Sequence, residues 1–175
     1  GESIREVCAD AGLTQDELHT WWQEECRRRV PEQAGSWDAA VGAAVTIDRD
    51  CWGIPRISAD CDEDLFFGFG YAMAQDRLFQ LDYLRRRAWG RLSEILGPDG
   101  IDLDLAARTI GIGSIAEAEW QRTPEETRQL VTAFAGGVNA VIDAAGERLP
   151  IEFDLLDYTP EPWSPMDCLA IAGEF

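Results

Sequence analysis

The chain of 175 residues carries 33 acidic side chains against 15 basic ones, which gives a formal net charge of −18. Every basic residue is Arg, because the sequence contains no Lys. Such an acidic surface repels nucleic-acid phosphates and anionic lipids, so we expect neither nucleic acid nor a membrane as a partner. Hydrophobic residues make up 46% of the sequence, which is enough for the core of one soluble globular domain.

The five cysteines are widely scattered and include no C-x-x-C pair, which argues against a zinc site or a fully paired set of disulfides. We expect mostly buried thiols, with a Cys51–Cys61 disulfide as the alternative. An odd number of unpaired cysteines favours the cytoplasm over the periplasm or the cell exterior. The sequence begins at Gly1 rather than Met, so we expect a preceding segment to have been removed. Whether that segment included a signal peptide is left open.

Residues 1–36 are predicted to form a helical hairpin. A short helix that begins near residue 4 stops at Gly12, because Gly readily adopts the conformation that ends a helix. A second helix opens with a capping box of Thr14 and Glu17 and continues to about Arg29.

A helical hairpin is also part of the helix-turn-helix domains that bind DNA. The first 36 residues, however, hold eight acidic and four basic side chains, whereas a phosphate backbone selects for basic charge. We therefore favour a docking element, in which Trp21 and Trp22 are buried against the body of the protein or against a partner.

Residues 37–44 are rich in Ala and Gly and are predicted to be a linker. The residues at 45–48 and 55–59 predict two β-strands, and Asp50-Cys51-Trp52-Gly53 between them supplies a turn. Residues 45–59 are therefore a predicted β-hairpin.

A long helix is predicted over residues 64–89, because apolar residues recur there at helical spacing in one broad stripe. The first half of this helix has a second apolar face, formed by Phe66, Phe69 and Met73. We expect this half to be enclosed, and polar groups in such a place need partners. The sequence therefore predicts a structural network around Asp76 and Arg77, without a catalytic role.

The remaining sequence predicts mainly helices, one at 91–96, one at 102–110 and one that starts at Thr123-Pro124 with the Thr as cap. Ser164-Pro165 repeats the same kind of helix start. The helix that follows is still apolar at Phe175, so we expect the chain to be incomplete at its C-terminus.

The chain offers little catalytic chemistry of its own. A Ser-His-Asp or Cys-His hydrolase would have to use the single histidine, His19, which lies in the charged N-terminal hairpin. Asp99, Asp102 and Asp104 are spaced like calcium ligands, but the sequence around them lacks the Gly and the closing Glu of a calcium loop. We expect no catalytic residue and no metal ligand in this chain.

Five motifs within residues 45–175 resemble the α-subunit of the penicillin acylase family, a branch of the N-terminal-nucleophile (Ntn) hydrolases. They follow the family's order and spacing, which makes the set far more specific than any single motif. The first three are RD-x-x-GIP-x-I-x-A at 49–59, GFGYAMAQDRLFQLDYLRRR at 68–87 and GRL-x-E-x-LG at 90–97. The last two are GVNA at 137–140 and PEPWSP-x-D at 160–167.

The resemblance implies a heterodimer that arises when one precursor cleaves itself. The first residue of the larger β-subunit, a Ser, Thr or Cys, would be the nucleophile and its α-amine the base, so the smaller subunit needs no imidazole. The implied fold is a mostly helical α+β subunit with a β-hairpin, which completes a four-layer αββα sandwich with the β-subunit. Residues 1–36 would be a helical extension, 37–44 a linker, and 45–175 the α-subunit.

The implied activity is hydrolysis of a linear acyl amide, such as a penicillin, an N-acyl amino acid, an acyl-homoserine lactone or a natural-product amide. The chain would supply scaffold and part of the acyl-pocket wall. Its structural network would include Asp76, Arg77 and Glu94, and Phe175 would lie at the edge of the substrate site. No cofactor is expected. The presence of a structural calcium ion is left open, and its α-subunit ligand would lie beyond this sequence.

Two features depart from the family pattern. Arg56 stands where the family usually has His, and residues 1–36 have no counterpart in the best-known members. Two other functions therefore stay open, a non-enzymatic binding module on the same fold and an acidic regulator that uses the N-terminal hairpin.

Overall fold

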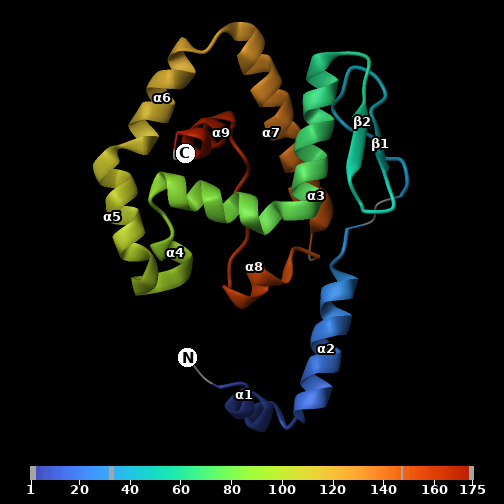
Figure 1. The fold of residues 1–175 in the computed structure, drawn as a ribbon, viewed down its shortest axis with the longest axis vertical. Coiled ribbons are helices and arrows are strands. Elements are labelled where there is room, and N and C mark those ends of the chain that lie inside the picture. Colours follow the sequence, from blue (N-terminus) through green and yellow to red (C-terminus); the bar gives the residue numbers. More distant parts are fainter. Residues whose placement is uncertain (1–2, 32–33, 147, 174–175) are drawn as a thin grey trace.

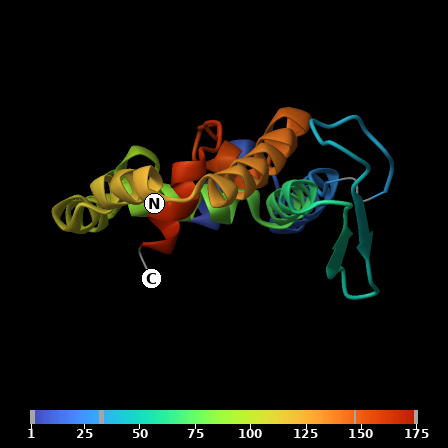
Figure 2. The same ribbon diagram turned by 90° about the horizontal axis from the view of Figure 1, so that it is seen from above.

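The computed structural model describes residues 3–31, 34–146 and 148–173. Within these ranges the chain forms a helical body, a β-hairpin at one edge of the body, and a two-helix arm that projects from it (Figure 1). Viewed at 90° to this, the helices form a flat layer and the hairpin extends from one side of it (Figure 2). The predicted class, a mostly helical α+β chain with one hairpin, is confirmed. In the described ranges, no helix is both long and apolar enough to cross a lipid bilayer.

The arm consists of α1 (Ile4–Ala11) and α2 (Gln15–Arg28). Both helices begin with a capping box, and Gly12 ends α1 in the left-handed conformation with φ of 67°. The predicted hairpin is thus confirmed. The expected burial of its tryptophans against the body is wrong, because Trp21 is 50% exposed and Trp22 is 38% exposed.

Arg29 fixes the arm to the body. Its Nη1 donates to the carbonyl of Leu149 at 3.0 Å, and its Nη2 forms an ion pair with Asp154. Glu25, one turn earlier on α2, accepts from Arg29 Nε at 2.8 Å and so holds the guanidinium in place. The direction of α2 is therefore set by hydrogen bonds and ion pairs at its C-terminal end.

The hairpin pairs β1 (Thr46–Arg49) with β2 (Pro55–Ser58) in antiparallel register, with Ile47 opposite Ile57. The Asp50 carboxylate stabilises the turn, since it accepts from the backbone N–H groups of Trp52 at 2.8 Å and of Ile54 at 2.9 Å. All five cysteines are free, so the alternative of a Cys51–Cys61 disulfide is wrong.

The long helix α3 (Asp62–Trp89) organises the body. It is not straight: Arg77 has non-helical backbone angles (φ −145°, ψ 31°), and the helix turns sharply there (Figure 1). The half before Arg77 packs against the hairpin and α7 (Glu125–Ala145), and the half after it packs against later parts of the body. The bend gives one helix two separate sets of neighbours.

Glycines bring α3 and α7 into close contact. A methyl group added at Gly70 would lie 2.1 Å from the carbonyl oxygen of Phe134, and one at Gly137 would lie 2.0 Å from that of Phe67. The backbones can approach this closely only because neither glycine has a Cβ. The main core surrounds this crossing, and its fully or nearly fully buried members include Tyr71, Ala74, Leu78, Leu81, Ala135, Val138, Val141, Leu149, Phe153 and Trp163.

Shorter helices complete the frame seen in Figure 1, with the last of them in its middle. They are α4 (Ser93–Leu96), the 3₁₀ turn η1 (Gly97–Gly100), α5 (Ile101–Ile110), α6 (Ile112–Arg122), α8 (Ile151–Leu155) and α9 (Pro165–Ala172). The helix start predicted at Ser164 is confirmed, and Asp167 completes a capping box there. The predicted cap at Thr123 is wrong, because its hydroxyl donates to the carbonyl of Glu119 and so closes α6.

Candidate functional site

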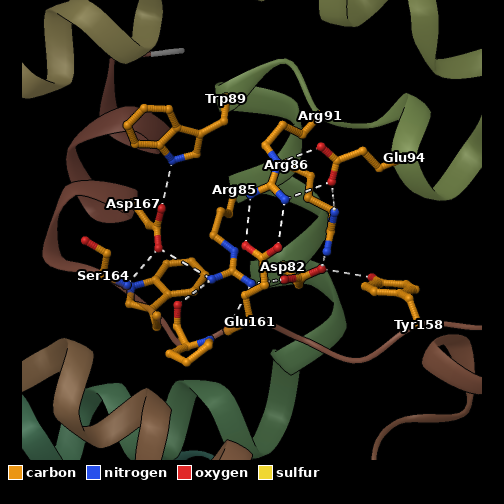
Figure 3. Close-up of polar contacts among 12 residues, drawn as sticks. Asp82, Arg85, Arg86, Trp89, Arg91, Glu94, Tyr158, Glu161, Ser164 and Asp167 are labelled. Carbon is orange, nitrogen blue, oxygen red and sulfur yellow. Dashed lines mark hydrogen bonds and ion pairs between the residues drawn. The ribbon is translucent and has the colours of Figure 1, made fainter.

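A group of buried charges lies where the second half of α3 meets the segment before α9 (Figure 3). Its centre is Asp82, which is only 1% exposed. The Asp82 carboxylate pairs with Arg85 and accepts from Arg86 Nε at 2.9 Å and from the Tyr158 hydroxyl at 2.9 Å. Residues three and four positions apart on a helix face the same side, so α3 itself brings both arginines to Asp82.

A second buried carboxylate, Asp167, faces α3 from the start of α9. It accepts from the Trp89 indole N–H at 2.7 Å and from the backbone N–H of Ser164 at 2.8 Å. Arg85 lies 3.5 Å from Asp167 and also donates to the backbone carbonyls of Pro162 and Glu161. A single guanidinium thus joins α3 to the chain more than 70 residues further on.

The network ends in more exposed ion pairs. Glu94 accepts from Arg86 Nη1 at 2.8 Å and from Arg91 Nε at 2.8 Å, and Arg91 also pairs with Glu161 at 2.7 Å. The hydrogen bonds from Arg91 lower the pKa of Glu161 to about 2, and they also lower the pKa of Glu94. Both carboxylates are therefore ionised at neutral pH.

Tyr158 completes the inner part of the network. Burial raises the pKa of its hydroxyl, and the negative charge of Asp82 raises it further. The hydroxyl therefore stays protonated and donates to the carboxylate at all physiological pH values. Its ring also lies under the guanidinium of Arg86, whose carbon is 4.7 Å from the ring centroid.

This arrangement is suited to holding chain segments together. Every charged group described above has an opposite charge beside it, and each buried carboxylate accepts at least three hydrogen bonds or ion pairs. Asp82 is 1% exposed and Asp167 is 6% exposed, so neither carboxylate is accessible to a substrate as a proton acceptor. The network is a clamp between α3, α4 and the segment 158–167.

The structure separates the residues of the predicted network. Asp76 and Arg77 do not pair: Asp76 forms an ion pair with Arg49 at 3.0 Å, while Arg77 Nη1 donates to Gln80 at 2.8 Å. The side chain of Asp76 is 35% exposed, because it precedes the bend of α3 and does not face the core. Glu94 does belong to an ion-pair network, but to the one centred on Asp82. Phe175 lies outside the described residues.

The contacts of Asp76 form a smaller cluster between α3 and the β-hairpin. Arg49, at the end of β1, donates to the carbonyl of Gly53 at 2.9 Å, to Asp76 at 3.0 Å and to Gln75 at 3.2 Å. Its side chain is almost fully buried. Arg49 therefore connects the hairpin turn to the last helical turn before the bend.

The other candidates from the sequence occupy unremarkable positions. His19 lies on the exposed face of α2, where a ring nitrogen is 2.7 Å from the Gln23 amide. Burial raises the pKa of the Cys168 thiol, which keeps it protonated. The carboxylate of Asp104, in α5, accepts from the backbone N–H groups of Leu92 and Ser93 and so stabilises the start of α4. Among the described residues, no group of three or more His, Cys, Asp or Glu could hold a metal ion.

Comparison with known proteins places this fold and its motifs in a family. The model of the penicillin amidase family matches residues 44–174, which is most of the sequence. The chain therefore belongs to the penicillin amidase family.

Individual relatives agree with this assignment. The chain is 36% identical over 150 residues to penicillin acylase 2 proenzyme of Pseudomonas sp. (strain SE83), which is 85% of this chain and 19% of that protein. It is 34% identical over 149 residues to the acyl-homoserine lactone acylase QuiP of Pseudomonas aeruginosa, which is 85% of this chain and 18% of that protein. The chain thus spans less than a fifth of the length of these relatives. Because residues 37–175 make up less than 85% of the chain, both alignments include part of the first 36 residues.

A solved structure has the same fold. The thermostable penicillin G acylase from Alcaligenes faecalis superposes with a TM-score of 0.70 at 31% sequence identity. The superposition covers 75% of this chain and 72% of that chain. The matched chain of that enzyme is therefore close in length to this one.

Proposed function

We propose that this chain is the α-subunit of a heterodimeric acylase that hydrolyses a linear acyl amide. Membership of the penicillin amidase family over residues 44–174 is the observation that carries the proposal. The relatives support it in two ways. They are penicillin acylases and acyl-homoserine lactone acylases, and one of them is named a proenzyme.

Chain lengths favour a subunit. The sequence spans 15% of penicillin G acylase of Escherichia coli and 19% of the Pseudomonas proenzyme, yet it covers 72% of the matched chain in the solved acylase. The matched chain of the solved acylase is therefore much shorter than these full-length relatives, which is expected if such an acylase consists of chains cut from one precursor. We infer that the larger product is the β-subunit and that it supplies the rest of the enzyme.

The proposed reaction uses a group outside this chain. The N-terminal Ser, Thr or Cys of the β-subunit attacks the amide carbonyl while its α-amine takes the proton. The amine product leaves, and water then releases the acyl group from the nucleophile. The role of this chain is to hold structural elements in position. The Asp82 network and the Arg49 cluster fix α3, the hairpin and α9 relative to one another.

Surfaces left uncovered in this chain support a partner. Phe69 on α3 is 44% exposed, so the described residues do not supply the enclosure expected from its second apolar face. The hairpin has two strands, and two-stranded sheets are only marginally stable in isolation. In the proposed complex the hairpin extends a sheet of the β-subunit, which gives the four-layer αββα sandwich.

Substrate and ion binding follow the same proposal. The substrate is a penicillin, an N-acyl amino acid, an acyl-homoserine lactone or a related amide, and this chain forms part of the wall around its acyl group, with Phe175 as a candidate contact. No cofactor takes part. A structural calcium ion, where present, takes its α-subunit ligand from residues beyond this sequence.

The test starts from the complete gene. Its product should be purified, both mature chains identified by intact mass and N-terminal sequencing, and hydrolysis followed on penicillin G, acyl-homoserine lactones and N-acyl amino acids. We expect a second, larger chain that begins with Ser, Thr or Cys, and hydrolysis of at least one substrate. A correctly cleaved complex that hydrolyses none of them would favour a binding module, and a single uncleaved chain would contradict the proposal.

A further inference from the structure

A groove of about 1110 Å³ lies between α7, the first half of α3 and the segment 37–42. Phe67 and Tyr71 of α3 line it, and Trp37 stacks on Tyr71 with 4.8 Å between the ring centroids. Asp64 holds the other end of the segment, because its carboxylate accepts from the backbone N–H groups of Gly42 at 2.8 Å and of Ala43 at 2.9 Å. These contacts fix one wall of the groove. Figure 2 shows this segment as the loop beside the end of α7, on the other side from the hairpin.

Uncompensated negative charge surrounds the groove. Asp38, Glu63, Glu125 and Asp143 line it, and in the described parts of the chain none of the four takes part in an ion pair or a side-chain hydrogen bond. Arg128 also lines the groove, where its guanidinium lies over Trp120 and donates to the Trp120 and Gln121 carbonyls, so its single positive charge offsets only part of the negative charge. In a chain of net charge −18, these carboxylates favour a cationic occupant.

The wall formed by α7 is long. Its two end carboxylates are 18 residues apart, which corresponds to about 27 Å along a helix. Between them, Ala133, Gly136 and Ala140 form a stripe of small residues along the groove. Small side chains let a second helix approach closely, as α3 already does at Gly137 on the neighbouring face.

We propose that this groove is the docking site for a basic amphipathic helix of the larger subunit. This inference rests on the proposed function, which supplies a larger chain from the same precursor. More than four-fifths of the length of the Pseudomonas relatives lies outside the part that this chain matches, so a segment of that kind has ample room in the precursor. Its apolar face would pack against Trp37, which is 49% exposed, and against the small residues of α7, and its Lys or Arg side chains would meet the four carboxylates.

Photo-crosslinking in the complete protein tests the occupant. Benzoylphenylalanine is introduced at Gln129, an exposed position of α7 in the groove, and in a control variant at Ala106, an exposed position of α5 outside it. We expect irradiation of the Gln129 variant to join this chain to a segment of the larger subunit that contains Lys or Arg, and the control to give a different product. A crosslink to a second copy of this chain, or none although the larger subunit is present, overturns the inference.

A charge test complements the crosslink. The double variant Glu125→Gln/Asp143→Gln should raise the dissociation constant of the two subunits about tenfold at low salt, and the difference should shrink at high salt. The control Glu117→Gln/Glu119→Gln, which removes two exposed charges from α6, should change it less than twofold. Equal effects of the two pairs would contradict the docking site. If intact mass reveals no larger chain at all, the proposed function itself fails, and the inference fails with it.

Discussion

The contact between α3 and α7 allows a sharp test with two neighbouring glycines. At Gly137, an added methyl group would lie 2.0 Å from the carbonyl oxygen of Phe67 and 2.7 Å from the backbone nitrogen of Tyr71. Both are backbone atoms of a helix, so neither can rotate away. At Gly136, the added group would meet only the ring of Phe67, at 3.4 Å and 3.5 Å, which is ordinary contact.

The expected effects have opposite signs. Gly→Ala inside a helix stabilises by about 1 kcal/mol when space allows, so Gly136→Ala should be neutral or slightly stabilising. Gly137→Ala gains the same term but forces the helices apart, at a cost near the upper end of the roughly 1–3 kcal/mol of overpacked cores. We therefore expect a net loss of about 2 kcal/mol.

The assay is unfolding of the mature complex, followed by circular dichroism at increasing temperature and urea concentration. Gly137→Ala should lower both midpoints, and Gly136→Ala should leave them unchanged or raise them. If the two variants behaved alike, the close backbone contact at Gly137 would not exist as described.

Three further predictions concern charged groups, and a fourth concerns His19 and the cysteines. Asp82→Asn should lower the free energy of unfolding in urea by about 3 kcal/mol, which is the lower end of the range for a broken buried ion pair. The loss stays at the lower end because Arg85 still pairs with Asp167 and Arg86 still pairs with Glu94, and the control Asp157→Asn, at an exposed position, should have no effect. Arg91 depresses the pKa of Glu161 to about 2, so the stability from this pair is complete above pH 4.5 and is lost as the pH falls towards 2; Arg91→Gln should flatten that part of the stability profile. Arg49→Ala should speed hydrogen exchange in 46–58 without changing it in 165–172, and equal speeding in both would refute the Arg49 cluster as a local link. His19→Gln and single replacements of each cysteine should leave turnover of the assembled enzyme within about tenfold, and a thousandfold loss in an assembled variant would place a catalytic group on this chain.

The sequence predicted well those features that a few neighbouring residues decide. The capping box at Thr14, the helix start at Ser164 and the turn around Asp50 depend on side chains that bond to backbone groups two to four residues away. Helical spacing of apolar residues gave the position of α3 in the same way. The motifs of the family also survive in linear order, so the family could be identified before the fold.

The buried network could be predicted only in part. The run Asp82-Tyr83-Leu84-Arg85-Arg86 places two arginines three and four residues after an aspartate, and this spacing could have pointed to the pair. The prediction named Asp76 and Arg77 instead, since both follow the most apolar part of α3. The bend at Arg77 leaves both of them exposed, and no pattern of polar and apolar residues records where a helix bends.

The sequence alone thus determined the helix starts, the hairpin and the family, because hydrogen bonds within one turn of chain need no distant partner. Only the tertiary structure decided that Asp82 is buried and Asp76 is not, that Tyr158 meets a carboxylate 76 residues away, and that Thr123 closes one helix and does not start the next. Such pairings depend on how whole helices pack. Once a charge is buried, it must find its partner wherever that packing brings one.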